Sequence, residues 1–359
     1  MRLPLMVLAA MAALAPVLLT GQSSQSTSLL ALSKQDHTVA IVDPGDLHVI
    51  ARVAVGDDPH EVVASADGKT AYVSNYGFGA FHTLTVIDLV GRKPQGTIDL
   101  GPLRGPHGLH FVQGKVWFTA EAAKAIGSYD PATGKVDWIM GTGQNRTHMI
   151  FVFPDAKTIL TTNVNAATVT ILEKTERAAG MPAAGPPPGT AGGAQPGMQS
   201  GMPLGPPPTP PGGDWNETVI PVGRGAEGFD VSPDGKEAWV ANAQDGTVSV
   251  IDIGTKKVTA TLDANARGAN RLKFTPNGKL VLLTPGSALV ILDAATRKEV
   301  KRLANVHGSG GIQMQPDGTR AYVACGRDGY VAVIDLRTLE QVGRIEIASP
   351  DGLAWAVEK

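Results

Sequence analysis

The chain has 359 residues, of which 43% are hydrophobic, and its 43 glycines and 26 prolines favour many tight turns over long helices. A net charge of −2 and a pI near 6.4 give no reason to expect nucleic acid or an anionic membrane as a partner. The single cysteine, Cys325, excludes an intrachain disulfide and a cluster of thiolate metal ligands.

Residues 1–21 are typical of a secretory signal peptide. Arg2 precedes an apolar run from Leu3 to Leu19, and Pro16 within that run argues against a membrane-spanning helix. No clean cleavage site follows, so the end of the signal lies between residues 21 and 28. We expect an exported protein, periplasmic or extracellular, with no transmembrane span in the mature chain. An uncleaved N-terminal anchor is the minority alternative.

Residues 29–359 are predicted to form one domain of repeats, of which residues 224–262 are the clearest copy. This stretch holds four short apolar runs separated by Asp234-Gly235, Asp245-Gly246 and Gly254-Thr255, a pattern typical of antiparallel strands joined by hairpins. One such unit is too small to bury its apolar faces alone, so it must stack on copies of itself.

The repeats align on the turn between their first two strands. The aligned turns are Asp67-Gly68, Gln113-Gly114, Asp155-Ala156, Asp234-Gly235, Asn277-Gly278 and Asp317-Gly318. They are 46, 42, 79, 43 and 40 residues apart, and a period in the low forties with four strands indicates a β-propeller blade.

An acidic column marks the end of each third strand. It consists of Asp43, Asp88, Asp130, Glu173, Asp252, Asp293 and Asp335. An Asp that opens a hairpin turn bonds its own backbone, so we interpret this column as structural rather than catalytic. The blade of Asp43 lacks an opening strand, which Pro350–Val357 can supply. The sequence therefore predicts an all-β, seven-bladed β-propeller of four-stranded antiparallel blades, closed by N- and C-terminal segments that share one blade.

The long step of 79 residues contains an insertion, residues 174–215, in the fourth repeat. Eleven prolines and ten glycines lie between Glu173 and Trp215 without apolar periodicity, which predicts a disordered hairpin-loop extension rather than a second domain. Met181, Met198 and Met202 permit a soft-metal site, but without a neighbouring His or Cys we favour a flexible tether.

The loop that enters each innermost strand should lie at the mouth of the central channel. That position is occupied around the ring by His60, His107, His148, Glu227, Asn270, Gly310 and Asp351. His60, His107 and His148 could hold a divalent metal, with Glu227 or Asp351 as a fourth ligand. Alternatively, the histidines cap strands or bond water in a wet channel.

An arginine column precedes the mouth column on four consecutive blades. It consists of Arg104, Arg146, Arg224 and Arg267. Single loop arginines are usually solvated, but four at matched positions suggest an arc of positive charge suited to carboxylate or phosphate.

The second strands carry Tyr72-Val73-Ser74-Asn75, Trp239-Val240-Ala241-Asn242 and Tyr322-Val323-Ala324-Cys325. With the preceding Pro-Asp-Gly turns and the following Val-Ile-Asp strands, they resemble the YVTN family of β-propeller repeats. The resemblance covers nearly all of the mature chain except the insertion, and it implies a seven-bladed secreted or cell-surface protein. It is specific for fold and weak for function.

Two enzyme families share this architecture. Pro59-His60 and Pro106-His107 are similar to blade openings of seven-bladed lactonases. Gly105-Pro106-His107-Gly108, Trp117-Phe118-Thr119 and Ile126-Gly127 resemble the repeat of streptogramin-lyase-type propellers. In that family a metal-binding Glu follows Trp-Phe-Thr, whereas here Ala120 occupies the place and Glu121 comes one residue later. A one-residue shift on a strand turns a side chain to the other face, which argues against the metal and the lyase chemistry.

We therefore expect a secreted binding scaffold with a ligand funnel at the channel mouth, suited to a protein or a small anion. The alternative is a lactonase-like hydrolase or a lyase with a His-bound divalent metal, the only cofactor the sequence suggests. No nucleic-acid partner is expected, and we expect a monomer.

Overall fold

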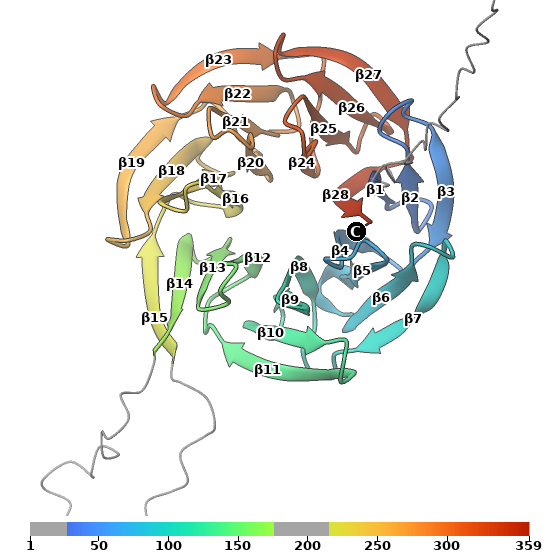
Figure 1. Cartoon of the computed structure of the whole chain (residues 1–359). Coiled ribbons are helices and arrows are strands. Elements are labelled where there is room, and N and C mark those ends of the chain that lie inside the picture. The colour runs from blue at the N-terminus through green and yellow to red at the C-terminus, as the bar shows by residue number, and fades with distance from the viewer. Residues whose placement is uncertain (1–26, 176–214, 359) are drawn as a thin grey trace, which may run out of the picture.

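The computed structural model describes residues 27–175 and 215–358. These residues form seven four-stranded antiparallel sheets arranged as a ring around a central channel (Figure 1). The seven-bladed all-β propeller predicted from the repeat period is therefore confirmed. The predicted signal peptide and residues 176–214 of the predicted insertion lie outside the described residues. Among the described residues, no helix is long and apolar enough to cross a membrane.

We number the blades in chain order and give the innermost strand of each first. Blade 1 consists of β28 (Pro350–Val357), β1 (Thr27–Ser33), β2 (Thr38–Val42) and β3 (Val49–Ala54). Blade 2 consists of β4 (Pro59–Ala64), β5 (Thr70–Asn75), β6 (Thr83–Asp88) and β7 (Lys93–Asp99), with the short 3-10 helix η1 (Gly77–Gly79) between β5 and β6. Blade 3 consists of β8 (Pro106–Val112), β9 (Lys115–Ala120), β10 (Ala125–Asp130) and β11 (Lys135–Gly141).

Blades 4 to 7 repeat this order. Blade 4 consists of β12 (Thr147–Val152), β13 (Thr158–Asn163), β14 (Thr168–Lys174) and β15 (Trp215–Pro221). Blade 5 consists of β16 (Ala226–Val231), β17 (Glu237–Asn242), β18 (Thr247–Asp252) and β19 (Lys257–Asp263). Blade 6 consists of β20 (Leu272–Phe274), β21 (Leu280–Leu283), β22 (Leu289–Asp293) and β23 (Lys298–Leu303). Blade 7 consists of β24 (Ile312–Met314), β25 (Arg320–Cys325), β26 (Tyr330–Asp335) and β27 (Glu340–Glu346).

The two ends of the chain close the ring within blade 1. Strand β28 pairs antiparallel with β1, from Thr27 opposite Val357 to Ser33 opposite Pro350. This pairing confirms the predicted closure. It pairs β1 on both sides, with β28 and β2, and so removes the free edge of β1 to which another chain could add a strand.

The insertion joins the third and fourth strands of blade 4, as predicted, because residues 176–214 lie between β14 and β15. Its described flank, Lys174, donates its backbone N–H to Lys157 in the turn between β12 and β13. That turn lies at the far end of β12 from Thr147, the end that faces the mouth. Lys174, the described residue that leads into the predicted insertion, therefore lies at the face opposite the mouth.

The hydrophobic core is divided among the interfaces between neighbouring blades. One cluster joins blades 5 and 6 around Trp239, another joins blades 7 and 1 around Tyr322, and both side chains are fully buried. Because each blade buries both faces against its neighbours, the ring is expected to lose stability when any one blade is lost.

The acidic column forms turns, as expected. A carboxylate oxygen of Asp43, Asp88, Asp130, Asp252, Asp293 and Asp335 accepts a backbone N–H two or three residues later in each case. Glu173, next to the insertion, pairs instead with Lys256 at 2.8 Å.

Candidate functional site

The innermost strands of blades 2 to 5 begin with a shift in pairing register. The shifts lie between Pro59 and Val62, Pro106 and Leu109, Thr147 and Ile150, and Ala226 and Phe229. Such an irregularity re-aims the residues within it. Those residues include His60, His107, His148 and Glu227, which line a cavity of about 420 Å³ at the channel mouth.

The cavity contains six of the seven residues of the mouth column. They are His60, His107, His148, Glu227, Asn270 and Asp351. Lys34, Arg146, Arg271, Ser309 and Arg327 also contribute to its lining. The alignment of repeats thus identified residues that the ring brings together.

Side-chain hydroxyls of the preceding blade form hydrogen bonds with the backbone of three site residues. The Ser74 hydroxyl accepts the N–H of Glu61 and donates to the carbonyl of His107 in the next blade. Thr119 bridges Gly108 and the His148 carbonyl in the same way, and Thr162 bridges Met149 and the Glu227 carbonyl. We call these three contacts the hydroxyl bridges.

Glycines let the innermost strands approach one another closely. A Cβ on Gly108 would lie 2.7 Å from the His148 carbonyl oxygen, and one on Gly228 would lie 2.5 Å from that of Asn270. Either distance is too short for a real side chain, so the glycines fix the spacing between strands that carry site residues.

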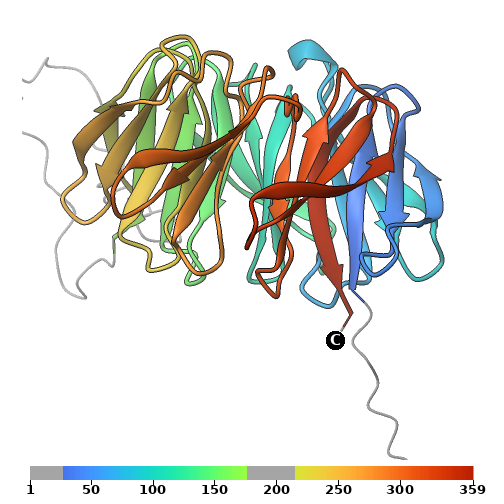
Figure 2. The same ribbon diagram turned by 90° about the horizontal axis from the view of Figure 1, so that it is seen from above.

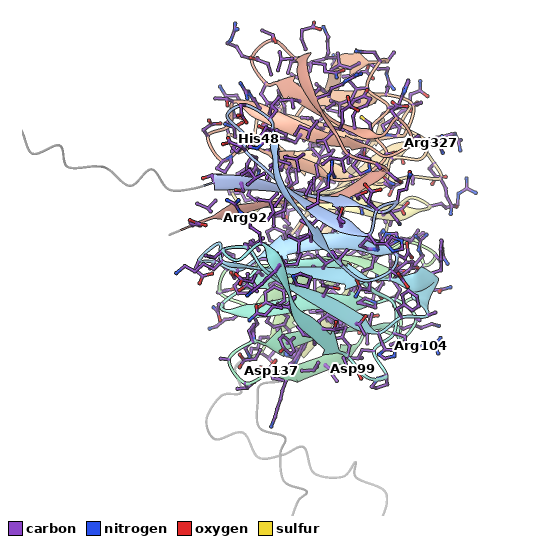
Figure 3. All side chains as sticks on the ribbon, turned by 90° about the vertical axis from the view of Figure 1, so that its right-hand side faces the viewer. His48, Arg92, Asp99, Arg104, Asp137 and Arg327 are labelled. Atoms are coloured by element: carbon purple, nitrogen blue, oxygen red, sulfur yellow. The ribbon has the colours of Figure 1, made fainter. Side chains whose placement is uncertain are left out.

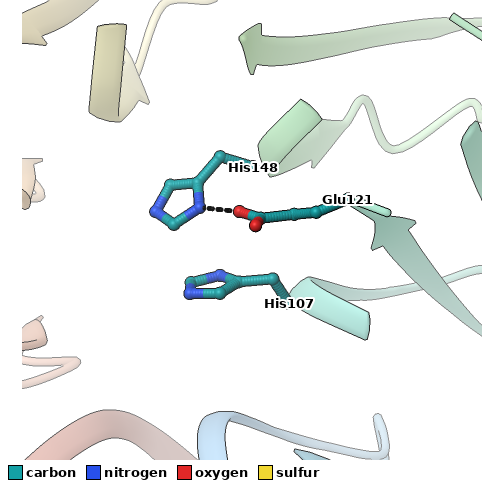
Figure 4. A group of neighbouring side chains, drawn as sticks. All are labelled: His107, Glu121 and His148. Carbon is teal, nitrogen blue, oxygen red and sulfur yellow. Dashed lines mark hydrogen bonds and ion pairs between the residues drawn. The ribbon is translucent and has the colours of Figure 1, made fainter. Parts of the chain in front are cut away.

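At the centre of the site, His107, Glu121 and His148 place one donor atom each within 4.8 Å of one another (Figure 4). All three are buried. His148 Nδ1 donates to Glu121 Oε1, and the Tyr76 hydroxyl donates to Glu121 Oε2. His107 Nδ1 and His148 Nε2 are buried and have no hydrogen-bond partner.

Burial and charge set the protonation of this cluster. Burial lowers the pKa of His107 well below its usual value, and the neighbouring His148 and His60 lower it further. Burial opposes ionisation of Glu121, but the hydrogen bonds from His148 and Tyr76 prevail and lower its pKa. Burial and the bond to Glu121 raise the pKa of Tyr76. The cluster therefore combines a neutral His107, an ionised Glu121 and a neutral Tyr76 hydroxyl near pH 7.

The prediction that the one-residue shift turns the Glu121 side chain to the other face, away from the histidines, was wrong. It assumed that Glu121 continues the alternation of strand β9, but β9 ends at Ala120 and Glu121 belongs to the following turn. In that turn its carboxylate reaches His148, which lies on the next blade. Alternation of faces applies only within a strand.

His60 belongs to a second group rather than to the buried trio. Lys34 Nζ lies 2.6 Å from His60 Nε2, and Asp58 and Asp351 lie 3.2 Å and 3.4 Å from the two ring nitrogens. The hydrogen bond to His60 lowers the pKa of Asp58, and Lys34 lowers it further. The ammonium group of Lys34 beside Nε2 makes His60 a poorer metal ligand than His107 and His148.

The structure does not bring the four column arginines together. Only Arg146 lines the mouth, with Nε and Nη2 each 3.5 Å from the carboxylates of Glu121 and Glu227 respectively. Arg224 is 72% exposed and pairs with Asp245, and Arg267 donates to the Gln244 carbonyl. Arg104 lies at the edge of the face that carries Arg327, whereas His48 and Arg92 lie on the other face (Figure 3).

The mouth is close to charge-balanced rather than positive. Its cations are Lys34, Arg146, Arg271 and Arg327, and its carboxylates are Asp58, Glu61, Glu121, Glu227 and Asp351. Arg271 pairs with Glu61 across the channel, and the carboxylates of Glu61, Asp351 and Glu227 outweigh burial and raise the pKa of Arg271. The predicted arc of uncompensated positive charge is therefore absent from the described mouth.

The sequence analysis missed a second column, the residue that follows each second strand. Blades 1, 2 and 3 place Lys34, Tyr76 and Glu121 there. Blades 4, 5 and 7 place Val164, Ala243 and Gly326 there, and in blade 6 the residue after β21 is Thr284. Only Lys34, Tyr76 and Glu121 bring a charged or phenolic side chain to this position, so the column is distinctive in the sequence once the strand ends are known.

Comparison with known proteins supports the fold more than the chemistry. The profile of the YNCE-like beta-propeller family matches residues 2–136. No curated protein matches the chain.

Similar solved structures include a protein of unknown function from Desulfotomaculum acetoxidans, with 12% identity, a TM-score of 0.69 and coverage of 92% of this chain and 99% of that one. A proposed 6-phosphogluconolactonase from Bacteroides uniformis has 14% identity and a TM-score of 0.69, with coverage of 92% of this chain and 99% of that one. A hydrazine synthase chain from Kuenenia stuttgartiensis has 17% identity and a TM-score of 0.64, with coverage of 87% of this chain and 93% of that one. At these identities the likeness extends to the fold alone.

Proposed function

We propose that the channel mouth binds a divalent metal ion through His107 Nδ1 and His148 Nε2, with Glu121 orienting the His148 ring through its Nδ1–H, and that the bound ion recruits a small anionic or carbonyl-bearing ligand. The supporting observation is the pair of buried, unpartnered imidazole nitrogens, His107 Nδ1 and His148 Nε2, beside an ionised carboxylate. Leaving buried polar atoms unbonded is costly. Two imidazoles with a carboxylate beside the free nitrogen, here Glu227 at 3.5 Å from His148 Nε2, form a donor set that suits zinc and other divalent transition metals.

Glu121 and Glu227 flank His148. Nδ1 donates to Glu121, while Nε2 lies 3.5 Å from Glu227 Oε1. A carboxylate on one imidazole nitrogen fixes the tautomer and the ring orientation, so the other nitrogen keeps its lone pair for a ligand. The residues present therefore fit a metal ion, which when bound can polarise a carbonyl or lower the pKa of water.

A bound cation also accounts for the anion preference that the sequence suggested. Without the ion, most cations of the mouth are already paired with carboxylates. With it, the mouth gains two positive charges. Exposed Arg327, at the same cavity, is available to contact a carboxylate or phosphate group.

Metal analysis of the purified protein and titration with Zn²⁺ and Mn²⁺ test this proposal. We expect stoichiometric binding that is lost in His148→Gln. His82→Gln, which changes a half-exposed histidine paired with Asp99, should bind metal like the parent. Acetate and phosphate should bind only after metal is added. If neither metal binds, the proposal is wrong and a protein-binding scaffold becomes the better hypothesis.

A lactonase-like hydrolase is the second candidate, favoured by the position of His60 between two carboxylates. Asp58 and Asp351 contact the two ring nitrogens and can orient His60, as carboxylates orient the imidazole of a general base. Release of acid from a panel of lactones by metal-loaded protein, compared with His60→Gln, tests this candidate. Equal rates for the two proteins would remove His60 from any such role.

Export of the chain stays a proposal based on residues 1–21, which lie outside the described residues. Fractionation of cells that express the full chain would test it.

A further inference from the structure

The helix η1 presents an aromatic side chain beside the mouth. Phe78 is 88% exposed, the highest value among the large apolar side chains of the described residues. Its φ of 51° lies in the left-handed region, which a bulky residue rarely adopts. Such a conformation persists only where the surroundings enforce it. In Figure 2, η1 (light blue) rises from the upper face, and β28 ends at the lower face.

Contacts on both sides hold the backbone of this helix. The N–H of Phe78 donates to Asp58 Oδ2 at 3.3 Å. A Cβ on Gly77 would overlap the ring of Phe81, and a Cβ on Gly105 would lie 3.0 Å from the Cα of Gly79. The helix is therefore packed against its neighbours while the Phe78 ring faces solvent.

A chain of ring contacts connects Phe78 to the buried trio. The rings of Phe78 and Tyr76 have centroids 6.4 Å apart. Tyr76 lies edge-on to His60 at 4.8 Å and to His107 at 5.2 Å, and its hydroxyl bonds Glu121. The distance between these centroids is in the range in which aromatic groups attract one another.

We propose that Tyr76 and Phe78 form an aromatic subsite that binds the phenyl or similar planar apolar group of a small carboxylate or ester, whose polar end lies at the mouth. The placement of the polar end rests on the proposed function; the aromatic contact does not. A planar group on Phe78 would cover an apolar ring that is otherwise in water, and would extend the existing series of ring contacts.

Phenylacetate and acetate are suitable probes because they share a carboxylate and differ by a phenyl ring. We expect zinc-loaded protein to bind phenylacetate more tightly in calorimetric titrations. Phe78→Asn should reduce that preference by roughly threefold to tenfold while leaving acetate binding unchanged. Because Asn adopts the left-handed conformation more readily than Phe, the variant should melt no lower than the parent.

Two further variants serve as controls. Phe78→Tyr keeps an aromatic ring and should keep the preference. Val90→Ala changes another exposed apolar side chain of blade 2, 63% exposed, in the turn of Arg92 on the opposite face, and should have no effect.

The outcomes separate this inference from the proposed function. A parent that does not prefer phenylacetate, or a Phe78→Asn variant that keeps the full preference, overturns the aromatic subsite even if metal binds. If no metal binds but metal-free protein shows a preference that Phe78→Asn loses, the subsite stands and the proposed metal function fails.

Discussion

Blades 3 and 5 have the same four strands and the same topology, but they differ where the second strand ends. In blade 5 this strand ends at Asn242, whose buried amide donates to the hydroxyls of Thr247 and Ser249, both at 2.9 Å. Asn75 and Asn163 make equivalent bonds in blades 2 and 4.

Blade 3 has lost all three members of this network. The strand registers place Ala120, Ala125 and Gly127 where blade 5 has Asn242, Thr247 and Ser249. The next residue, Glu121, points into the mouth, where its counterpart in blade 5 is Ala243. In blade 5, the most regular repeat, the residues at the end of the second strand stabilise the blade. In blade 3, where the repeat pattern is interrupted, the corresponding region supplies a residue of the candidate site instead.

Opening the ring should cause the largest loss of stability, because blades 3 and 5 both depend on the packing of neighbouring blades around the closed ring. Deletion of residues 350–359 removes β28, including buried Leu353 and Ala354, and leaves β1 with an unpaired edge. We expect aggregation or a loss comparable to a domain's whole stability, roughly 5–15 kcal/mol. Thermal melting, with deletion of residues 358–359 alone as a control, measures this. A deletion protein that melts like the parent would contradict closure through blade 1.

Asn242→Ala should destabilise the protein without affecting metal binding. It leaves the buried Ser249 hydroxyl and the half-buried Thr247 hydroxyl without their donor, so the free energy of unfolding should fall by about 2–3 kcal/mol. Urea unfolding measures the loss. The reciprocal change Ala120→Asn should not stabilise blade 3, because Ala125 and Gly127 offer no hydroxyls. A gain in stability would show that the two blades differ less than described.

Glu121→Gln should weaken metal binding while leaving the stability of the fold nearly unchanged. The amide keeps the size of the side chain but loses its charge, so we expect metal affinity to fall roughly 10- to 100-fold. Because the amide can still bond Tyr76, the midpoint of urea unfolding should change little. Glu217→Gln, on the outer strand β15, is a charge-matched control. A variant that binds metal normally would exclude Glu121 from the metal site.

Asp252→Asn should have the smallest effect, and one that depends on pH. The hydrogen bonds from the backbone and side chain of Thr255 lower the pKa of Asp252 from its usual 3.8. Ionised Asp252 thus stabilises the fold above that value, and the contribution is lost as pH falls through the lowered pKa. The variant should be slightly less stable at pH 7, and the difference from the parent should shrink as the pH falls through the lowered pKa of Asp252.

Urea unfolding at several pH values measures this difference, with Thr255→Ala as a partial version of the same change. A gap that stays constant with pH would rule out the charge of Asp252 as its cause.

The fold could be predicted from the sequence because the repeat is visible in local signals. Asp-Gly turns, acidic third-strand ends and apolar alternation recur at a fixed period, and each is set by residues close in the chain. The mouth column was also predictable, since alignment of the repeats transfers a position in one blade to all the others.

The chemistry of the mouth was harder to predict because it depends on contacts between blades and on strand ends. Glu121 was misjudged because its position relative to the end of β9 decides where its side chain points. The prediction that the column arginines gather at the mouth was wrong for a different reason. Arg224 pairs with Asp245 and Arg267 donates to the Gln244 carbonyl, and alignment of the repeats does not reveal these loop contacts.

The hydroxyl bridges have a consequence for how such a ring can change over evolutionary time. Ser74, Thr119 and Thr162 each bond an amide of their own blade and a carbonyl of the following one, namely that of His107, His148 or Glu227. Each of blades 2, 3 and 4 therefore supplies a hydrogen bond that holds a site residue of the next blade. Recombination that exchanges one of them for a blade without the hydroxyl would disturb a site residue that the exchanged segment does not contain. Inheritance of this mouth thus requires blades 2 to 5 to be transmitted together.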